Sequence, residues 1–195
     1  AAYHAGQLSF MRRLASMPDS EFQPRSADTA PHAARSKEIL LNLMDWAWRS
    51  GNSFDIFSDL TKDLSPEDAD QTPNGLPSIT HIVNHMAFWE EYVAKRLRGE
   101  STENMPPAQP GGLPPDPAPW PQAAELMLRW HDEVESALGS LTSEELWAPR
   151  PGTGKHFEQG KSAHWLVCGI INHYAYHHGQ IVLLSQMMGH EDHFI

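Results

Sequence analysis

The stretch "AHWLVCGIINHYAYHHGQIVLLSQMM", residues 163–188, decides the fold of this chain. Written as an α-helix it is apolar on almost every side, and a helix of that kind is central in a helical bundle. It carries His173 and His177, which are four residues apart. Four helical residues turn through about 400°, so the two imidazoles leave one face about 40° apart. This spacing allows both rings to bind one metal ion.

Three further blocks with a helical apolar period precede this stretch, and no stretch alternates like a β-strand for long. Four blocks predict an all-α protein, a four-helix bundle. The three blocks are residues 33–48 (with a shorter piece at 54–64), residues 79–98 and residues 121–140. In the second of them Ser78 precedes the helix, Gly99 is its stop, and the apolar stripe is Ile82, His85, Met86, Trp89, Val93 and Leu97. A short turn of helix is expected at 142–147, and loops at 65–78 and 148–162.

Residues 99–120 form a long Pro-rich connection between the second and third long helices. They carry seven prolines and three glycines, so no regular element is expected there. At about 3.1 Å per residue such a segment reaches about 60 Å, whereas a helix of 20 residues is about 30 Å long. The connection is therefore long enough to return along the whole bundle and to let both helices run in the same direction.

Composition excludes several classes of protein. The length of 195 residues suits one domain, and the net charge of −11 without a basic run argues against a nucleic-acid surface. No apolar stretch approaches the roughly 20 residues of a membrane span, and no signal-peptide pattern is present, so a cytoplasmic location is expected. The single cysteine, Cys168, excludes an intrachain disulfide and is expected to be a small core residue.

Histidine is the unusual residue type, with twelve copies. His81 and His85 repeat the i, i+4 spacing, and so many histidines produce such pairs by chance, with rings that are hydrogen-bonded or face water. Buried neutral imidazoles need partners, however, and a metal ion satisfies one nitrogen of each ring while a carbonyl or carboxylate satisfies the other. His178 is expected to face outward, and His164, half a turn from His173, is expected to lie outside the site.

Two motifs carry a resemblance to a known family. "INHYAYHHGQIVLL" (171–184), with the pattern H-x-x-x-H-x-G-Q, and "LPSITHIVNHMAFWEEYVAKRLRGE" (76–100) resemble the last and second helices of DinB-like (DinB/YfiT) proteins. The resemblance covers about residues 35–189. It implies an up-down-down-up four-helix bundle, often a homodimer, with a three-histidine site for nickel, zinc or a similar divalent ion. The ligands it implies are His85, His173 and His177; Gln180 matches the motif's glutamine, and His81 matches no family ligand.

The resemblance also implies a chemistry. Three neutral histidines leave coordination positions for water or substrate, as in catalytic metal sites, and the ion lowers the pKa of a bound water or thiol. Characterised relatives include S-transferases that use low-molecular-weight thiols such as bacillithiol, and a mycothiol-dependent isomerase. A metal-dependent transferase of this thiol type, or a hydrolase, acting on a small molecule is therefore expected. Two alternatives stay open: a non-enzymatic metal-binding sensor or stress-response bundle, and a bundle whose histidines are structural.

The opening of the chain nearly repeats its last helix. "AYHAGQL" (2–8) parallels "AYHHGQI" (175–181), but the partner histidine four residues before His4 would fall at position 0. The favoured explanation is a relic of tandem duplication; chance or borrowed similarity, and a working arm that packs on the domain or on a dimer partner, are the alternatives. Residues 1–31 are accordingly predicted to be an N-terminal arm, and residues 32–195 the bundle domain.

Overall fold

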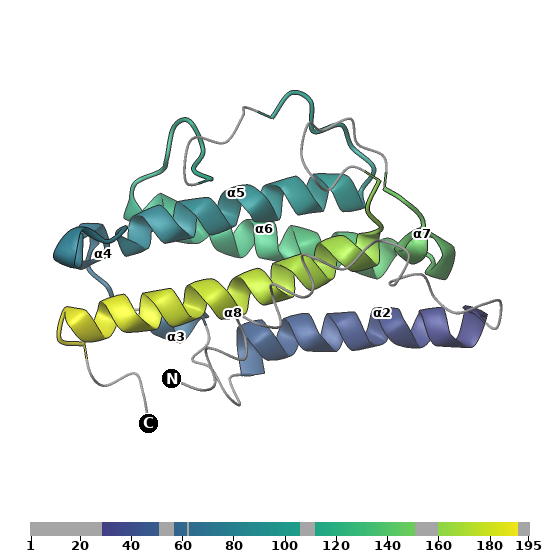
Figure 1. Cartoon of the computed structure of the whole chain (residues 1–195), viewed down its shortest axis with the longest axis horizontal. Helices are drawn as coiled ribbons and strands as arrows, with labels where there is room; N and C mark the ends of the chain where they lie inside the picture. The colour runs from purple at the N-terminus through teal and green to yellow at the C-terminus, as the bar shows by residue number, and fades with distance from the viewer. Residues whose placement is uncertain (1–28, 51–56, 62, 106–111, 151–159, 191–195) are drawn as a thin grey trace.

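The computed structural model describes residues 29–50, 57–61, 63–105, 112–150 and 160–190. Four long helices form a bundle (Figure 1), and no strand is present within these ranges, which contain a single isolated bridge between Pro149 and Ser162. The elements are α2 (Thr29–Asp45) with the π-helical turn η2 (Trp46–Ser50), α3 (Phe57–Thr61), α4 (Pro66–Asp70), the 3₁₀ turn η3 (Pro73–Gly75), α5 (Ile79–Leu97), α6 (Trp120–Ser140), α7 (Ser143–Trp147) and α8 (Ala163–Met187).

The long Pro-rich connection joins two helices that run in the same direction (Figure 1). Asn84 near the start of α5 pairs with Ala118 just before α6, and Arg98 just after α5 pairs with Glu133 in the second half of α6. Helices α2 and α8 run the opposite way (Figure 1). Lys37 at the middle of α2 donates to the carbonyl groups of Gly139 and Leu141 at the end of α6. Between α5 and α6 the described residues contain neither helix nor strand, and α6 begins at Trp120, one residue earlier than predicted.

Local signals place the ends of the two helices that carry the histidine motifs. The Ser78 hydroxyl accepts a hydrogen bond from the backbone N–H of His81, and Ser162 caps α8 in the same way. Gly99 follows α5 with a φ of 75°, a left-handed conformation that favours glycine. The predicted start of α5 after Ser78 and its stop near Gly99 are therefore confirmed.

Two predicted boundaries differ from the structure. The stretch 65–78 was expected to be a loop, yet it contains α4 and η3, because Ser65 caps a helical turn that begins with Pro66. Helix α2 begins at Thr29 and so includes Pro31, which the first turn of a helix tolerates. The start of the predicted piece at 54–64 lies outside the described residues, and α3 covers only its middle.

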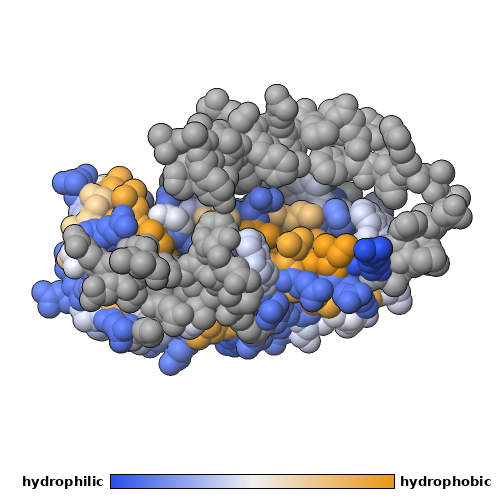
Figure 2. Space-filling model, turned by 90° about the horizontal axis from the view of Figure 1, so that it is seen from below, coloured by the Kyte–Doolittle hydropathy of each residue, from blue (hydrophilic) through white to orange (hydrophobic). Residues whose placement is uncertain are grey.

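The core lies between α8 and the three other long helices. On α5 the predicted stripe is confirmed, with His85 and Trp89 half-buried and its four other members buried. On α2 Leu40 and Met44 are buried, whereas Ile39 and Leu43 are 47% and 41% exposed, so the buried face of this helix is narrow. Apolar side chains among hydrophilic ones are visible from the side on which α2 lies (Figure 2). None of the helices in the described ranges has the length and apolar character needed to cross a bilayer.

Candidate metal centre

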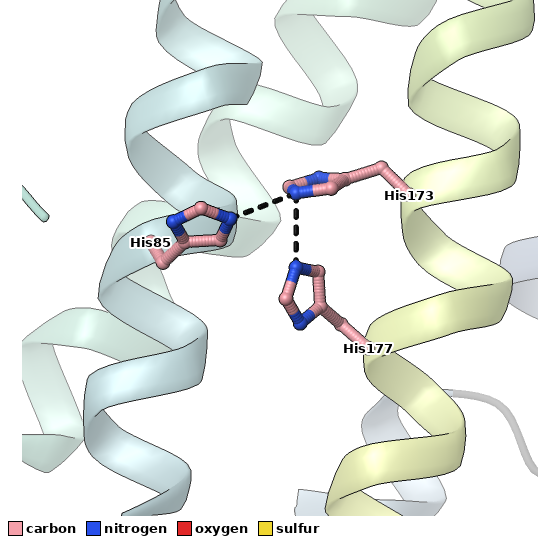
Figure 3. A group of neighbouring side chains, drawn as sticks. All are labelled: His85, His173 and His177. Atoms are coloured by element: carbon pink, nitrogen blue, oxygen red, sulfur yellow. Dashed lines mark hydrogen bonds between the residues drawn. The ribbon is translucent and has the colours of Figure 1, made fainter. Parts of the chain in front are cut away.

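Three histidines from two long helices converge between α5 and α8 (Figure 3). His85 projects from α5, and His173 and His177 project from successive turns of α8. The Nε2 atom of His173 lies 2.9 Å from Nε2 of His85 and 2.9 Å from Nε2 of His177. Within the described residues these three form the group of potential ligands that could hold a metal ion.

Packing of α5 against α8 creates the convergence. The i, i+4 spacing on α8 places His173 and His177 on one face, and their ring centroids are 4.3 Å apart. That face meets the stripe of α5, so the His85 ring lies 4.9 Å and 4.8 Å from the other two. His177 is buried, and His85 and His173 are half-buried. The cluster is thus largely shielded from water, with some access left.

In His85 and His177 the Nδ1 atom points away from the cluster. The hydrogen bond that Nδ1 makes determines which nitrogen of each ring carries the proton. Nδ1 of His85 lies 3.2 Å from the carbonyl oxygen of Gly112, and a carbonyl oxygen can only accept. Nδ1 of His177 lies 2.6 Å from Oε1 of Gln180, whose amide nitrogen donates to the Tyr176 hydroxyl. Both rings therefore carry their proton on Nδ1 and present the Nε2 lone pair to the centre of the cluster.

The cluster in this form lacks protons for its own hydrogen bonds. The Nε2 atom of His173 faces the Nε2 lone pairs of both His85 and His177. A neutral His173 ring carries a single proton, so it cannot donate to both of them. Its Nδ1 is buried without a hydrogen-bond partner in the described part of the chain. A divalent cation accepts lone pairs from all three Nε2 atoms at once, and the outer contacts to Gly112 and Gln180 are those that ligating histidines make. The donor set therefore fits a metal ion of the kind that imidazole binds, such as zinc or nickel.

Burial keeps the rings of His173 and His177 neutral. It lowers the pKa of His173 well below its ordinary value, and the neighbouring imidazoles of His177 and His85 lower it further. Burial also lowers the pKa of His177 to about 4, with a contribution from His85, although the bond to Gln180 opposes the shift. Both rings are uncharged at neutral pH, which is the form that binds a metal ion.

The other histidines that the sequence singles out lie outside this cluster. His81 and His164 do not join it, as expected; the His164 ring stacks on Trp147 at 4.2 Å. The prediction that His178 faces outward is wrong, because its side chain is 2% exposed and packs near Trp48. The turn η2 and α3 cover this side of α8, and the all-round apolar character of α8 was the signal that every face of the helix has a neighbour.

Sequence reasoning missed two features around the centre. No spacing rule relates Gly112 to His85, because the contact depends on where the crossover lies in space. A buried polar group also lies in the core: Glu90 and Tyr174 are fully buried, and Nδ1 of His131 lies 2.9 Å from the Tyr174 hydroxyl. Glu90 falls on the buried stripe of α5, four residues after Met86, so helical periodicity could have found it.

The fold and the site together define a class: an all-helical bundle in which two neighbouring helices bring three histidines to one point. The chain belongs to the DinB superfamily, whose family model matches residues 52–181. No curated protein and no solved structure gives a significant match. The resemblance seen in the two histidine motifs is therefore confirmed at the level of the family.

Proposed function

We propose that the protein binds one divalent ion, nickel or zinc, through His85, His173 and His177, and uses it to act on a small molecule. The reaction we propose is a transfer of the thiol S-transferase type, or a hydrolysis. The observation that carries the proposal is the position of Nε2 of His173, which lies 2.9 Å from Nε2 of His85 and 2.9 Å from Nε2 of His177. Hydrogen bonds at Nδ1 hold the rings of His85 and His177 as lone-pair donors at Nε2.

The residues of this chain have separate tasks in the proposal. Gly112 and Gln180 orient His85 and His177 through contacts with their Nδ1 atoms, and α8 places His173 one turn before His177. Burial of His173 and His177 holds these two rings neutral and limits their contact with water. A divalent ion held by three neutral imidazoles supplies a Lewis acid that lowers the pKa of a bound water or thiol. Three protein ligands leave further coordination positions for that water or thiol.

The chain's own thiol does not serve as the nucleophile. Cys168 is the only cysteine of the sequence, and burial raises its pKa to about 11. At neutral pH it is therefore a protonated, half-buried side chain that packs against the core, and only the thiolate is reactive. A thiol reaction at this site accordingly takes its sulfur from a small-molecule thiol substrate.

Elemental analysis of the purified protein, combined with a screen for conjugation of low-molecular-weight thiols to an electrophilic dye, tests the proposal. We expect one divalent ion per chain and turnover that disappears in His177→Ala. His81→Ala is the matched control, because His81 lies outside the cluster, and it keeps both. Metal without turnover against thiols or hydrolysable esters would contradict the enzymatic part and favour a sensor. Absence of bound metal after incubation with nickel or zinc would overturn the proposal as a whole.

We further propose that the protein assembles as a homodimer. Sedimentation velocity tests this directly, and a monomeric species at micromolar concentration would contradict it.

A further inference from the structure

The Pro-rich crossover touches the candidate metal centre at one backbone position. The carbonyl oxygen of Gly112 accepts a hydrogen bond from Nδ1 of His85 at 3.2 Å. The φ of Gly112 is +76°, and a Cβ atom built there would lie 2.5 Å from Cε1 and from Nδ1 of His85 and 3.1 Å from Nε1 of Trp89. Contacts below 3.0 Å do not occur for real Cβ atoms, so only glycine allows the backbone to come this close to the ring.

The crossover is also anchored beside this contact. Asn84, which precedes His85 on α5, is 3% exposed, and its side chain forms a reciprocal pair with the backbone of Ala118. Both hydrogen bonds of the pair are 2.8 Å long, and the amide nitrogen of Asn84 also donates to the carbonyl of Thr80. Two consecutive residues of α5 therefore hold two points of the same connection.

We propose that Gly112 is a positioning residue of the metal centre. Its carbonyl keeps the proton of His85 on Nδ1, so that Nε2 faces the other two histidines as a lone-pair donor. Its lack of a side chain is what permits the hydrogen bond. A side chain at this position displaces the imidazole, breaks the bond to the carbonyl and lets the neutral ring carry its proton on Nε2, the atom that the metal needs.

The metal-binding part of this inference rests on the function proposed above, whereas the tautomer of His85 does not. Partners that orient a ligating histidine commonly contribute about 10- to 100-fold to metal affinity. The contact acts through His85, so removal of the imidazole should also remove most of the effect of a substitution at position 112.

The experiment compares Gly112→Ala with Gly160→Ala. Gly160 has a φ of +77°, and a Cβ atom there meets no atom of the described residues within 4 Å. Both variants thus place an alanine at nearly the same positive φ, and only the first adds a contact with His85. We expect Gly112→Ala to bind zinc about 10- to 100-fold more weakly than Gly160→Ala in competition with a chromophoric chelator. In a His85→Ala background, the thermal stabilities of the two glycine variants should come close to each other.

Nitrogen-15 NMR of the metal-free wild-type protein gives an independent readout, because imidazole shifts and couplings identify the protonated nitrogen. We expect His85 to be protonated on Nδ1 in the wild type and in Gly160→Ala, and to lose this preference in Gly112→Ala. If Gly112→Ala does not fold, recovery of folding in the double variant with His85→Ala supports the proposal.

The outcomes separate this proposal from the proposed function. Equal zinc affinity in the two glycine variants would overturn the role of Gly112 while leaving metal binding intact. A wild-type His85 protonated on Nε2 would also overturn it. A wild-type protein that binds no metal would overturn the proposed function, and the NMR and stability comparisons would still decide the contact between Gly112 and His85.

Discussion

Glu90→Gln is expected to flatten the pH dependence of stability. Glu90 lies fully buried on α5, beside the hydroxyl of Tyr174. Burial raises the pKa of Glu90 from 4.5 to about 8, and the negative charge of Glu135 adds to this, while the neighbouring Tyr174 hydroxyl offsets part of it. In the folded protein at neutral pH this carboxyl is therefore largely protonated.

The sign and size of the effect follow from proton binding. Between about pH 4.5 and 8 the folded state holds a proton on Glu90 that the unfolded chain has released. The contribution of Glu90 to the free energy of unfolding is thus fully present below pH 4.5 and falls as the pH rises to 8, by about 1.4 kcal/mol per pH unit. From about pH 5.5 to about pH 7.5 the wild type loses about 2–3 kcal/mol through this group.

Glutamine keeps the shape of the side chain and removes its titration. The free energy of unfolding of Glu90→Gln minus that of the wild type should therefore rise by about 2–3 kcal/mol over the same interval. Any constant cost of burying the glutamine amide cancels, because only the change with pH is used.

Urea denaturation at several pH values measures this difference, with a chelator present so that bound metal does not contribute. Glu91→Gln is the matched control: Glu91 is the next residue, its side chain is 29% exposed, and it accepts a hydrogen bond from Lys95. Its difference from the wild type should stay within about 0.5 kcal/mol at every pH. Parallel pH profiles for the wild type and Glu90→Gln would refute the reasoning.

Three further predictions concern the metal centre and its surroundings. Bound metal should be released only well below the ordinary histidine pKa of about 6.5, toward the value of about 4 at His177, when metal content is followed by dialysis at decreasing pH; full retention at pH 4 would count against an all-histidine site. Asn84→Ala should lower the free energy of unfolding by about 1–3 kcal/mol, because the backbone N–H and carbonyl of Ala118 and the carbonyl of Thr80 lose their hydrogen bonds to the Asn84 side chain. An unchanged urea midpoint would contradict this. If the opening repeat is a relic, His4→Ala and deletion of residues 1–31 should leave metal content and activity unchanged, and loss of activity with metal still bound would make it part of the site.

The amino-acid sequence by itself determined the features that depend on neighbours along one helix. Ser78 and Gly99 delimit α5 because a cap and a left-handed glycine act on the backbone beside them. The pairing of His173 with His177 follows from helical spacing alone. Membership of His85 in the site came from the resemblance of two motifs, since no local rule relates residues 88 positions apart.

Only the tertiary structure decided which faces of these helices are covered and where the crossover lies. The sequence pattern placed His178 outside, but η2 and α3 pack against that face and bury it. The same packing determines that the backbone of Gly112 reaches the His85 ring and that Glu90 has no access to water. Periodicity defines the faces of one helix. The burial of a side chain and the tautomer of a histidine depend instead on atoms that other segments bring to that face, and only the packing of the whole bundle determines where those segments lie.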